Sequence, residues 1–456
     1  MKKNPHLETF ETYKNSKKIF FVGIGGISMS SLARYAKDDG KTVSGSDRTE
    51  SDLTRALEAS GIGVIIGHDG KNVSGFDMAV YTGAIGDDNP EICAAKAAGI
   101  PVFSRAEFLG AIMLEYPVRV GISGSHGKST ATAMTAHVLL LAGKNPTVLC
   151  GAASSDLDGA YRRGERSILF EACEYKDSFL EFSPNIAVIL GADYDHVDYF
   201  KNERAVIDSF SKFAKISSDD GGSVIVCADD KGAVEATKNE FAITFGIDEE
   251  ADYKAENVRF DGGFARFDVL RTDEEYISVS LSVPGKHNIY NALAAIAVCD
   301  LMGVPADVIS AAVSDFSGIP RRFEHVCDKN GVKIYTDYAH HPKEIAETLK
   351  TAKSVASGRI ITVFEPHTYS RTAVLFDAFV RAFDSADVKI FTDIYAARET
   401  DTMGVSGEKL AIAAGGKYVS SYVEAANEAL AAAQSGDMIL ILGAGTVSQV
   451  ADIIGG

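Results

Sequence analysis

Residues 124–130 read GSHGKST, follow an apolar run and precede an alanine-rich helical pattern. Glycines let the backbone approach an anion, and the free amides and positive end of a helix attract phosphate. Lys128 can reach the outer phosphates of a nucleotide, and the Ser129 hydroxyl can bind Mg²⁺. The loop is shorter than a usual P-loop, because Ile122 stands where the first glycine would be. The pattern predicts a nucleoside triphosphate site made by Gly124, Ser125, His126, Gly127, Lys128, Ser129 and Thr130.

Acidic residues follow two further apolar runs. Glu171 and Glu174 come after SILF, and NIAVIL is followed by Asp193, Asp195, His196 and Asp198. Carboxylates and a histidine at strand ends suit Mg²⁺ held beside a phosphate chain. The alternative is a pair of solvated acidic loops. Their occurrence with a phosphate-binding loop favours the metal.

The N-terminal stretch FFVGIGGISMSS contains Gly23-x-Gly25 and has Ser28 where a dinucleotide fingerprint has its third glycine. Asp47 lies 22 residues after Gly25. Such a turn can hold any diphosphate, whether NAD or a nucleotide sugar. From these residues alone, NAD, another diphosphate ligand and plain turn chemistry all stay open.

Polar residues also follow strand-like runs nearer the C-terminus. DYAHHPKE and FEPHTYSRT gather three histidines, Tyr338 and Arg371, and PGKHNIYNA carries Asn288 and Asn291 at a helix start. Residues in loops after strands are placed for ligand contacts, although paired histidines can also bind metal. Arg321 and Arg322, beside a hinge-like GIP, can form surface ion pairs or contact phosphate.

The elements that position these residues alternate between strands and helices, which indicates an α/β fold. We predict three domains: a Rossmann-like N-terminal domain over 1–116, a central P-loop ATPase domain over 117–317, and a Rossmann-like C-terminal α/β domain over 318–456. An antiparallel β appendage to the central domain is predicted over 252–283, with a hairpin at residues 261–263.

Composition limits the class of protein. The 456 residues carry a formal net charge of -18, which disfavours nucleic acid and anionic membrane as partners. Six scattered cysteines fit free thiols in a reducing compartment. The N-terminal stretch lacks a leader-like apolar segment, and no apolar run is long enough for membrane insertion. We expect a cytoplasmic protein.

In order along the chain, the motifs resemble those of the Mur ligase family of peptidoglycan precursor enzymes, and most closely its alanine-adding branch. The residues that carry the resemblance are FVGIGGISMS, SGSD, TGAIGDDNPE, GSHGKST, EACEYKDSFL, DHVDYF, GKHNIYNA, FSGIPRRFE, DYAHHPKEI, EPHTYSRT and LGAGTV. They extend along nearly the whole chain. The family uses a short glycine-lysine loop, which accounts for the shortened P-loop.

The resemblance implies ATP-dependent ligation of L-alanine to the lactyl carboxylate of UDP-N-acetylmuramate through an acyl phosphate. It also implies roles for individual residues. Catalytic roles fall to Lys128, His196, Arg322 and Asp337, and Mg²⁺ binding to Ser129, Glu171 and, at a second site, His196. Besides the phosphate loop, ATP contacts fall to Asn288, Asn291 and Arg322. The UDP-sugar contacts are Gly23, Gly25, Gly26, Ser46 and Asp47, and the amino-acid contacts are Tyr338, His340 and Arg371.

The chain departs from the family pattern at Ser28 and at Thr82-Gly83, which affects the expected UDP contacts. Carbamoylation of Lys212, as some relatives carry on a lysine, is not expected in the alanine-adding branch. Three alternatives remain: a relative that attaches a tripeptide to the same nucleotide sugar, an NAD-dependent oxidoreductase, and a nucleotide-gated binding protein without turnover. We expect small-molecule partners only, and a monomer or homodimer.

Overall fold

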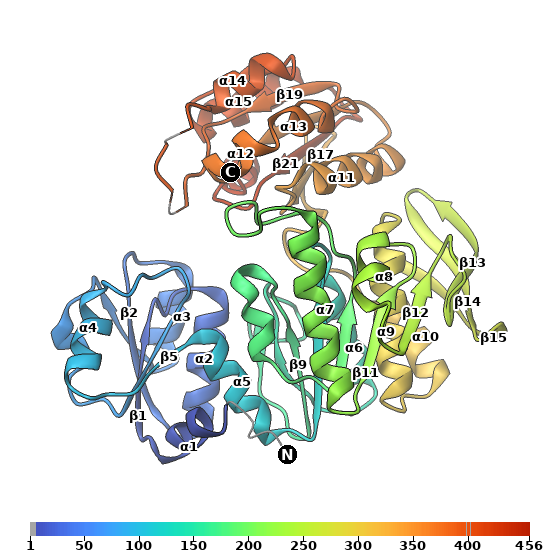
Figure 1. Ribbon diagram of the computed structural model, residues 1–456. Coiled ribbons are helices and arrows are strands. Elements are labelled where there is room, and N and C mark those ends of the chain that lie inside the picture. Colours follow the sequence, from blue (N-terminus) through green and yellow to red (C-terminus); the bar gives the residue numbers. More distant parts are fainter. Residues whose placement is uncertain (1–5, 398, 402) are drawn as a thin grey trace. The chain divides into compact units, whose positions relative to one another are not determined.

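The computed structural model describes residues 6–397, 399–401 and 403–456 (Figure 1). The first five residues, part of the stretch that argued against a leader segment, lie outside this description. The chain forms two compact units. One contains the described residues up to Ala192 together with Ile207–Ile243 and Leu301–Val304, and the other contains Asp193–Val206, Thr244–Asp300 and Pro305–Gly456. This grouping does not test the three predicted domain boundaries, which stay a prediction.

The first unit begins with a five-stranded parallel sheet in the order β3-β2-β1-β4-β5. The order in which strands are added to the sheet reverses between β1 and β4, the position where α/β sheets bind ligands. The strands are β1 (Lys18–Val22), β2 (Thr42–Asp47), β3 (Gly63–Ile66), β4 (Met78–Tyr81) and β5 (Val102–Ser104). The helices are α1 (Leu7–Asn15), α2 (Ile27–Asp38), α3 (Asp52–Ala59), α4 (Pro90–Ala97) and α5 (Arg105–Ile112), with short 3₁₀ turns η1 (Gly70–Val73) and η2 (Met113–Glu115).

A second group of strands in the same unit has β6 at its centre, in the order β11-β10-β6-β9-β7-β8. All pairs are parallel except β7 with β8. The strands are β6 (Val118–Ser123), β7 (Thr147–Leu149), β8 (Tyr161–Arg162), β9 (Ser167–Glu171), β10 (Ile186–Ile189) and β11 (Ser223–Cys227). The helices are α6 (Lys128–Leu141), η3 (Tyr175–Glu181), α7 (Glu203–Asp219) and α8 (Lys231–Thr237).

The second unit contains the predicted antiparallel appendage. β13 (Tyr253–Asp261), β14 (Phe264–Arg271) and β15 (Glu274–Pro284) pair in sequence as antiparallel strands, after β12 (Ala242–Gly246). The predicted turn is confirmed, because Gly262 and Gly263 both have positive φ, as a tight hairpin requires. Two helices follow, α9 (His287–Leu301) and α10 (Ala306–Asp315).

The rest of this unit is a six-stranded sheet in the order β16-β17-β21-β18-β19-β20. Only the edge strand β16 is antiparallel. The strands are β16 (Glu324–Lys329), β17 (Val332–Asp337), β18 (Ile360–Phe364), β19 (Val388–Phe391), β20 (Lys417–Tyr418) and β21 (Met438–Leu442). The helices are α11 (Pro342–Val355), α12 (Tyr369–Val374), α13 (Phe376–Ala382), α14 (Gly407–Ala413), α15 (Tyr422–Ala432) and α16 (Gln449–Gly455). The predicted α/β fold with parallel sheets is confirmed.

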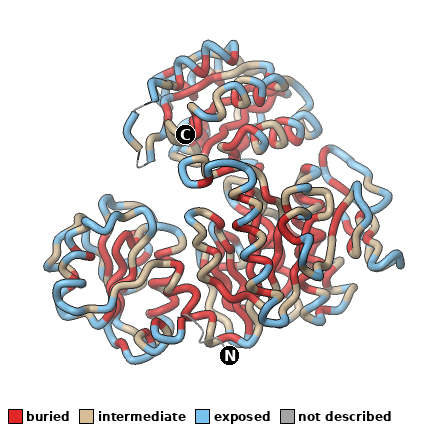
Figure 2. The backbone as a smooth tube through the Cα atoms, in the orientation of Figure 1, coloured by how far each residue is buried: buried red, intermediate tan, exposed pale blue. Residues whose placement is uncertain are grey.

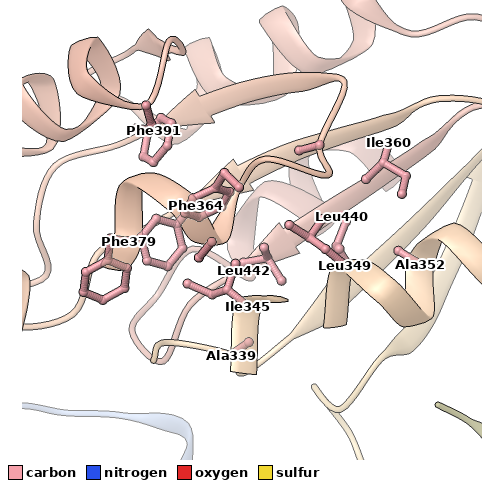
Figure 3. Close-up of a cluster of buried hydrophobic side chains, with 14 of the residues drawn as sticks. Ala339, Ile345, Leu349, Ala352, Ile360, Phe364, Phe379, Phe391, Leu440 and Leu442 are labelled. Atoms are coloured by element: carbon pink, nitrogen blue, oxygen red, sulfur yellow. The ribbon is translucent and has the colours of Figure 1, made fainter. Parts of the chain in front are cut away.

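Alternation along the central strands builds two cores in this sheet. On β21, Leu440 and Leu442 join the core under α11, α13 and α14, whereas Ile439 and Ile441 join the core under α15 and α16. Because successive strand residues point to opposite faces, a continuous apolar run is buried on both sides. Figure 3 shows the first of these cores, where Phe364 lies among other aromatic rings.

Burial follows the position of a strand in its sheet. The central strands β1, β10, β18 and β21 are buried along most of their length, whereas the residues of β3 and β16 are exposed or half-buried, and Figure 2 shows buried segments running through the middle of each part. Within the described ranges, no helix is both long and apolar enough to cross a membrane. Several helices begin at a side-chain cap, including Ser104 before α5 and Asn89 before α4, which satisfy amides that the helix leaves unpaired.

Replacing Phe364 with alanine tests the C-terminal core. Phe364 is fully buried, and its ring contacts Phe379, Phe383 and Phe391. We expect Phe364→Ala to lower the free energy of unfolding by about 3–5 kcal/mol, because a ring-sized cavity remains. Urea unfolding measures this loss. The matched control is Ile412→Ala, whose side chain is 72% exposed and which should cost no more than about 0.5 kcal/mol. Equal losses in the two variants would contradict this packing.

Candidate functional site

The predicted phosphate loop joins β6 to α6 in the first unit. Gly124 has φ of 140°, and a Cβ there would lie 2.8 Å from the Cβ of Leu190, so only glycine fits. The Ser125 amide donates to Gly191 O at 3.0 Å, which ties the loop to the end of β10. Gly127 has φ of 83°, and α6 begins after it without a side-chain cap. The first amides of α6 therefore remain for an anion.

Lys128, the first residue of α6, contacts both the loop and Glu174. Its Nζ lies 3.0 Å from Glu174 Oε2 and also donates to Gly124 O. Burial disfavours its charge, but the Glu174 carboxylate outweighs burial and raises the pKa of Lys128 above its ordinary value. The ammonium therefore stays charged beside the phosphate loop. Glu174, which the sequence placed in an acidic loop, holds this lysine.

Ser129 and Glu171, two of the predicted metal ligands, lie on either side of Cys150. The Cys150 Sγ is 3.6 Å from Ser129 O and 3.4 Å from Glu171 Oε1. The Gly151 amide donates to the same Glu171 oxygen. Among the residues that the structure describes, none donates to Glu171 Oε2. The Ser129 oxygen near Cys150 is its backbone carbonyl. A carboxylate with one oriented oxygen and one open oxygen fits the oxygen ligands that Mg²⁺ requires.

The glycine loop after β1 is held mainly by β2. The amides of Gly23 and Ile24 donate to Ser46 O at 2.8 and 2.9 Å, and the Gly25 amide donates to Asp47 Oδ2 at 2.8 Å. Two of the amides expected to face a diphosphate are thus bonded within the protein. The α2 helix, which begins after Gly26, has no side-chain cap. Its first amides are the stronger candidates for an anion.

The Ser46 side chain is fully buried and donates to Glu91 Oε2 at 2.6 Å. The same carboxylate contacts His68 Nδ1 at 2.8 Å and accepts from Asn72 Nδ2 at 2.7 Å. Three partners compensate the burial of Glu91, which is 0% exposed. Ser46 therefore braces the strand ends. The sequence reasoning missed Glu91, because its partners lie 19 to 45 positions away.

Arg105, the first residue of α5, is a second missed residue. Its Nη1 donates to Ser28 Oγ at 3.0 Å. Within the described part of the chain, its guanidinium has no further hydrogen bond and no ion pair, although it has five donors. Burial lowers the pKa of Arg105, while Cys173 and Glu171 oppose that shift. A half-buried, uncompensated guanidinium beside the start of α2 is suited to an anionic ligand.

In the second unit, the predicted adenine contacts lie at the start of α9. Asn288 and Asn291 are buried and bonded to each other, with Asn291 Nδ2 donating to Asn288 Oδ1 at 2.9 Å. Asn288 Nδ2 donates to Pro284 O. A cavity of about 570 Å³ lies beside the start of α9, and its lining includes His287, Tyr290 and Thr351 but neither asparagine.

Asp337, at the end of β17, is committed to the backbone. Its Oδ2 accepts from the Phe323 amide and its Oδ1 from the Ala339 amide, both at 2.7 Å. Burial raises the pKa of Asp337, against the opposing effect of Arg322. Asp337 thus positions the Arg322 segment, where Phe323 has a left-handed φ of 48°. Arg322 itself lies over the Tyr338 ring, 4.9 Å from its centroid.

The predicted amino-acid contacts gather near this strand end. Tyr338 and His340 pack edge to face, and the His340 ring lies 5.7 Å from that of His367. Burial lowers the pKa of His340. Arg371 pairs with Asp195, a residue of the segment Asp193–Val206 in the same unit.

Asp195 precedes His196, the histidine expected at a second metal site. The His196 amide donates to Asp195 Oδ1 at 2.6 Å, and His196 has a left-handed φ of 52°. Burial opposes ionisation of Asp195, but Arg371 and the neighbouring histidines outweigh it and hold its pKa well below the usual range.

The predicted residues thus form two groups. The phosphate loop, Glu171 and the UDP-sugar residues belong to the first unit. The second unit holds Asn288, Asn291, Arg322, Asp337, Tyr338, His340, Arg371 and His196. The roles of all these residues stay predictions.

Comparison with known families finds three matches that follow one another along the chain. Residues 18–117 match the Mur ligase family catalytic domain, 122–299 the Mur ligase middle domain, and 321–445 the Mur ligase glutamate ligase domain.

Curated relatives are similar over nearly the full length. A UDP-N-acetylmuramate–L-alanine ligase from Caldicellulosiruptor bescii is 43% identical, over 96% of this chain and 98% of the relative. The ligase of the same name from Clostridium perfringens is 42% identical, over 98% and 99%. Among solved structures, the UDP-N-acetylmuramate–alanine ligase of Thermotoga maritima has a TM-score of 0.83 at 29% identity, covering 96% of this chain and 98% of that one. A murein peptide ligase from Psychrobacter arcticus shares the fold, with a TM-score of 0.72 at 24% identity over the same shares.

The half-buried histidine beside the 570 Å³ cavity, His287, is expected to make the stability of the protein depend on pH. Burial lowers the pKa of His287 to about 4, while Glu347 opposes that shift. As pH falls below about 6.5, the unfolded chain takes up a proton that the folded chain resists, so stability is lost between pH 6.5 and 4. We expect wild type to lose about 2 kcal/mol more than His287→Gln between pH 7 and 5, measured by urea unfolding. His325→Gln, at an exposed histidine, is the control and should behave as wild type. Equal losses in wild type and His287→Gln would contradict the assignment.

Proposed function

Since this chain belongs to the Mur ligase family, we propose that it joins L-alanine to the lactyl carboxylate of UDP-N-acetylmuramate at the expense of ATP, in peptidoglycan precursor synthesis. The observation that carries this proposal is 42–44% identity to ligases of that name over 96–98% of the chain. The consecutive matches to three Mur ligase domains agree with it.

The proposed reaction has two steps. A lactyl carboxylate oxygen attacks the γ-phosphorus of ATP, the bond to ADP breaks, and an acyl phosphate forms. The alanine nitrogen then attacks the acyl carbon, and the carbon–oxygen bond to phosphate breaks. The nitrogen loses its protons to solvent or phosphate, and amide, ADP and phosphate result. Phosphorylation is needed because an ionised carboxylate is a poor electrophile with no adequate leaving group.

Lys128 is proposed to neutralise the outer phosphates as charge shifts in the first step. Support comes from its place at the start of α6 and from the Glu174 contact, which keeps its ammonium charged. The uncapped start of α6 offers amides to the same phosphates.

Ser129 and Glu171 are proposed to hold Mg²⁺, and His196 a second ion. The open Oε2 of Glu171 supports the first assignment. A bound divalent cation would screen the repulsion between the carboxylate and the γ-phosphate.

In the second unit, Asn288 and Asn291 are proposed to contact adenine, with Arg322 reaching the nucleotide. Asp337 is proposed to act by positioning Arg322, because backbone amides occupy both of its oxygens. Tyr338, His340 and Arg371 are proposed to form the amino-acid site. A cytoplasmic location and a monomeric or dimeric state stay predictions.

Phosphate release tests the activity directly. We expect purified protein to release phosphate only when ATP, Mg²⁺, UDP-N-acetylmuramate and L-alanine are all present, with the amide product seen by mass spectrometry. Lys128→Met should lower kcat by at least about 100-fold, through lost electrostatic stabilisation of the transferring phosphate. Lys215→Met removes a lysine from an exposed ion pair and is the matched control.

Two outcomes would redirect the proposal. Release without the sugar nucleotide would indicate an ATPase with a different acceptor. Product with a tripeptide but not with alanine would place the protein among the tripeptide-adding relatives. The fold would not contradict this outcome, because this chain also shares its fold with the murein peptide ligase of Psychrobacter arcticus. Full activity of Lys128→Met would contradict the assignment of the phosphate loop.

Arg105 offers a second, more local test. The uncompensated guanidinium beside Ser28 is proposed to bind the diphosphate of the sugar nucleotide. We expect Arg105→Gln to raise the KM for UDP-N-acetylmuramate about 10–100-fold, as for a lost charged hydrogen bond, and to leave the KM for ATP and L-alanine unchanged. Arg55→Gln, at an arginine with two exposed ion pairs, is the control. A change confined to the KM for ATP would contradict this role.

A further inference from the structure

The ion pair between Arg371 and Asp195 is buried. Arg371 Nη2 lies 3.0 Å from Asp195 Oδ1, and the two side chains are 9% and 8% exposed. Arg371 belongs to α12, and Asp195 follows β10 within the segment Asp193–Val206 of the same compact unit. Burying two charges is costly, so each charged group must be well compensated or serve a ligand.

The hydrogen bonds of Asp195 are concentrated on one oxygen. Oδ1 receives both the Arg371 guanidinium and the His196 amide, the latter at 2.6 Å. No residue in the described ranges donates to Oδ2. Oδ2 is not one of the fully enclosed polar atoms that lack a partner, so this oxygen is open to a ligand with a donor group.

Arg371 also keeps donors for a ligand. Nη2 bonds to Asp195, and Nη1 lies 3.4 Å from His367 Nδ1. Nε has no acceptor within the part of the chain that the structure describes. The ion pair therefore places hydrogen-bond donors of the Arg371 guanidinium next to an acceptor oxygen of the Asp195 carboxylate.

We propose that Asp195 is a substrate-binding residue, whose Oδ2 accepts hydrogen bonds from the ammonium of the incoming amino acid while Arg371 binds its carboxylate. This inference rests on the proposed function, which makes an α-amino acid the nucleophile. Such a molecule reaches the site as a zwitterion with opposite charges on adjacent groups. A site that pairs with both charges of the amino acid compensates the loss of the hydrogen bonds that water made to them.

A second ion pair supplies a matched control. Asp193, two positions before Asp195, pairs with Lys343 of α11 in the same unit. The Lys343 side chain is 62% exposed, so this pair lies at the surface and is worth little. Asp193→Asn therefore controls for the loss of a carboxylate from this segment, and hydroxamate formation reports whether Asp195 only attaches the segment to α12.

The experiment compares full-length wild type, Asp195→Asn, Asp195→Glu and Asp193→Asn. Steady-state rates with varied L-alanine and saturating ATP and UDP-N-acetylmuramate give KM and kcat. Hydroxylamine in place of alanine traps the acyl phosphate as a hydroxamate, which reports the first step independently of the amino-acid site. Hydroxylamine is uncharged near neutral pH and does not need an ammonium partner.

We expect Asp195→Asn to raise the KM for L-alanine on the order of 10–100-fold while retaining hydroxamate formation. Asp195→Glu, which keeps the charge, should recover part of the loss, and Asp193→Asn should match wild type. An unchanged or lower KM for alanine in Asp195→Asn would overturn the inference. So would equal loss of hydroxamate and alanine product, which would mean that Asp195 only holds the segment in place. If wild type formed neither product, the proposed function would fail instead.

Discussion

Parallel strands bring all of their carboxyl ends to one edge of a sheet, and most of the candidate site residues in this protein depend on that geometry. The glycine loop and Asp47 follow β1 and β2, and the phosphate loop and Glu171 follow β6 and β9. In the C-terminal sheet, Asp337 is the last residue of β17, and α12, which carries Arg371, comes after β18. Because right-handed crossovers return a helix to the face of the sheet, helix N-termini meet the same edge. The free amides at helix N-termini, which can bind anions, therefore lie at the same sheet edge as these polar side chains.

An acidic protein that handles anionic substrates must separate its own carboxylates from them. Here several carboxylates accept hydrogen bonds from the protein itself: the half-buried Asp47 from Gly25, and the buried Glu91 and Asp337 from Ser46 and Asn72 and from two backbone amides, respectively. These bonds compensate the buried charge and hold the loops. In the candidate sites, the positive charge for anionic groups comes from individual residues: Lys128, Arg105 and Arg371. Each of them contacts a protein oxygen that fixes its position.

The strands could be predicted where they are apolar runs, and the Gly262–Gly263 turn where two glycines permit positive φ. Strand β16 was not predicted, because its sequence EHVCDK is mostly polar, as an edge strand with exposed residues can be. An available signal was Asn330-Gly331, which joins β16 to β17 and has the composition of a tight hairpin. The phosphate loop could be predicted because its chemistry lies in one short segment. Arg105 and Glu91 could not, because their partners lie 77 and 45 positions away.

The sequence by itself determined the α/β class, the phosphate loop and the family resemblance, since each is written in local periodicity or in short motifs. Only the tertiary structure showed which contacts the predicted residues make within the protein. Ser46 and Asp337 were expected at ligands, yet the first donates to Glu91 and the second accepts from backbone amides. In the sequence, nothing distinguishes Asp195 from the other carboxylates of its segment. In the structure, it pairs with Arg371, 176 positions away. Hydrogen bonds between distant segments leave no local pattern, because they depend on how the sheets and loops pack.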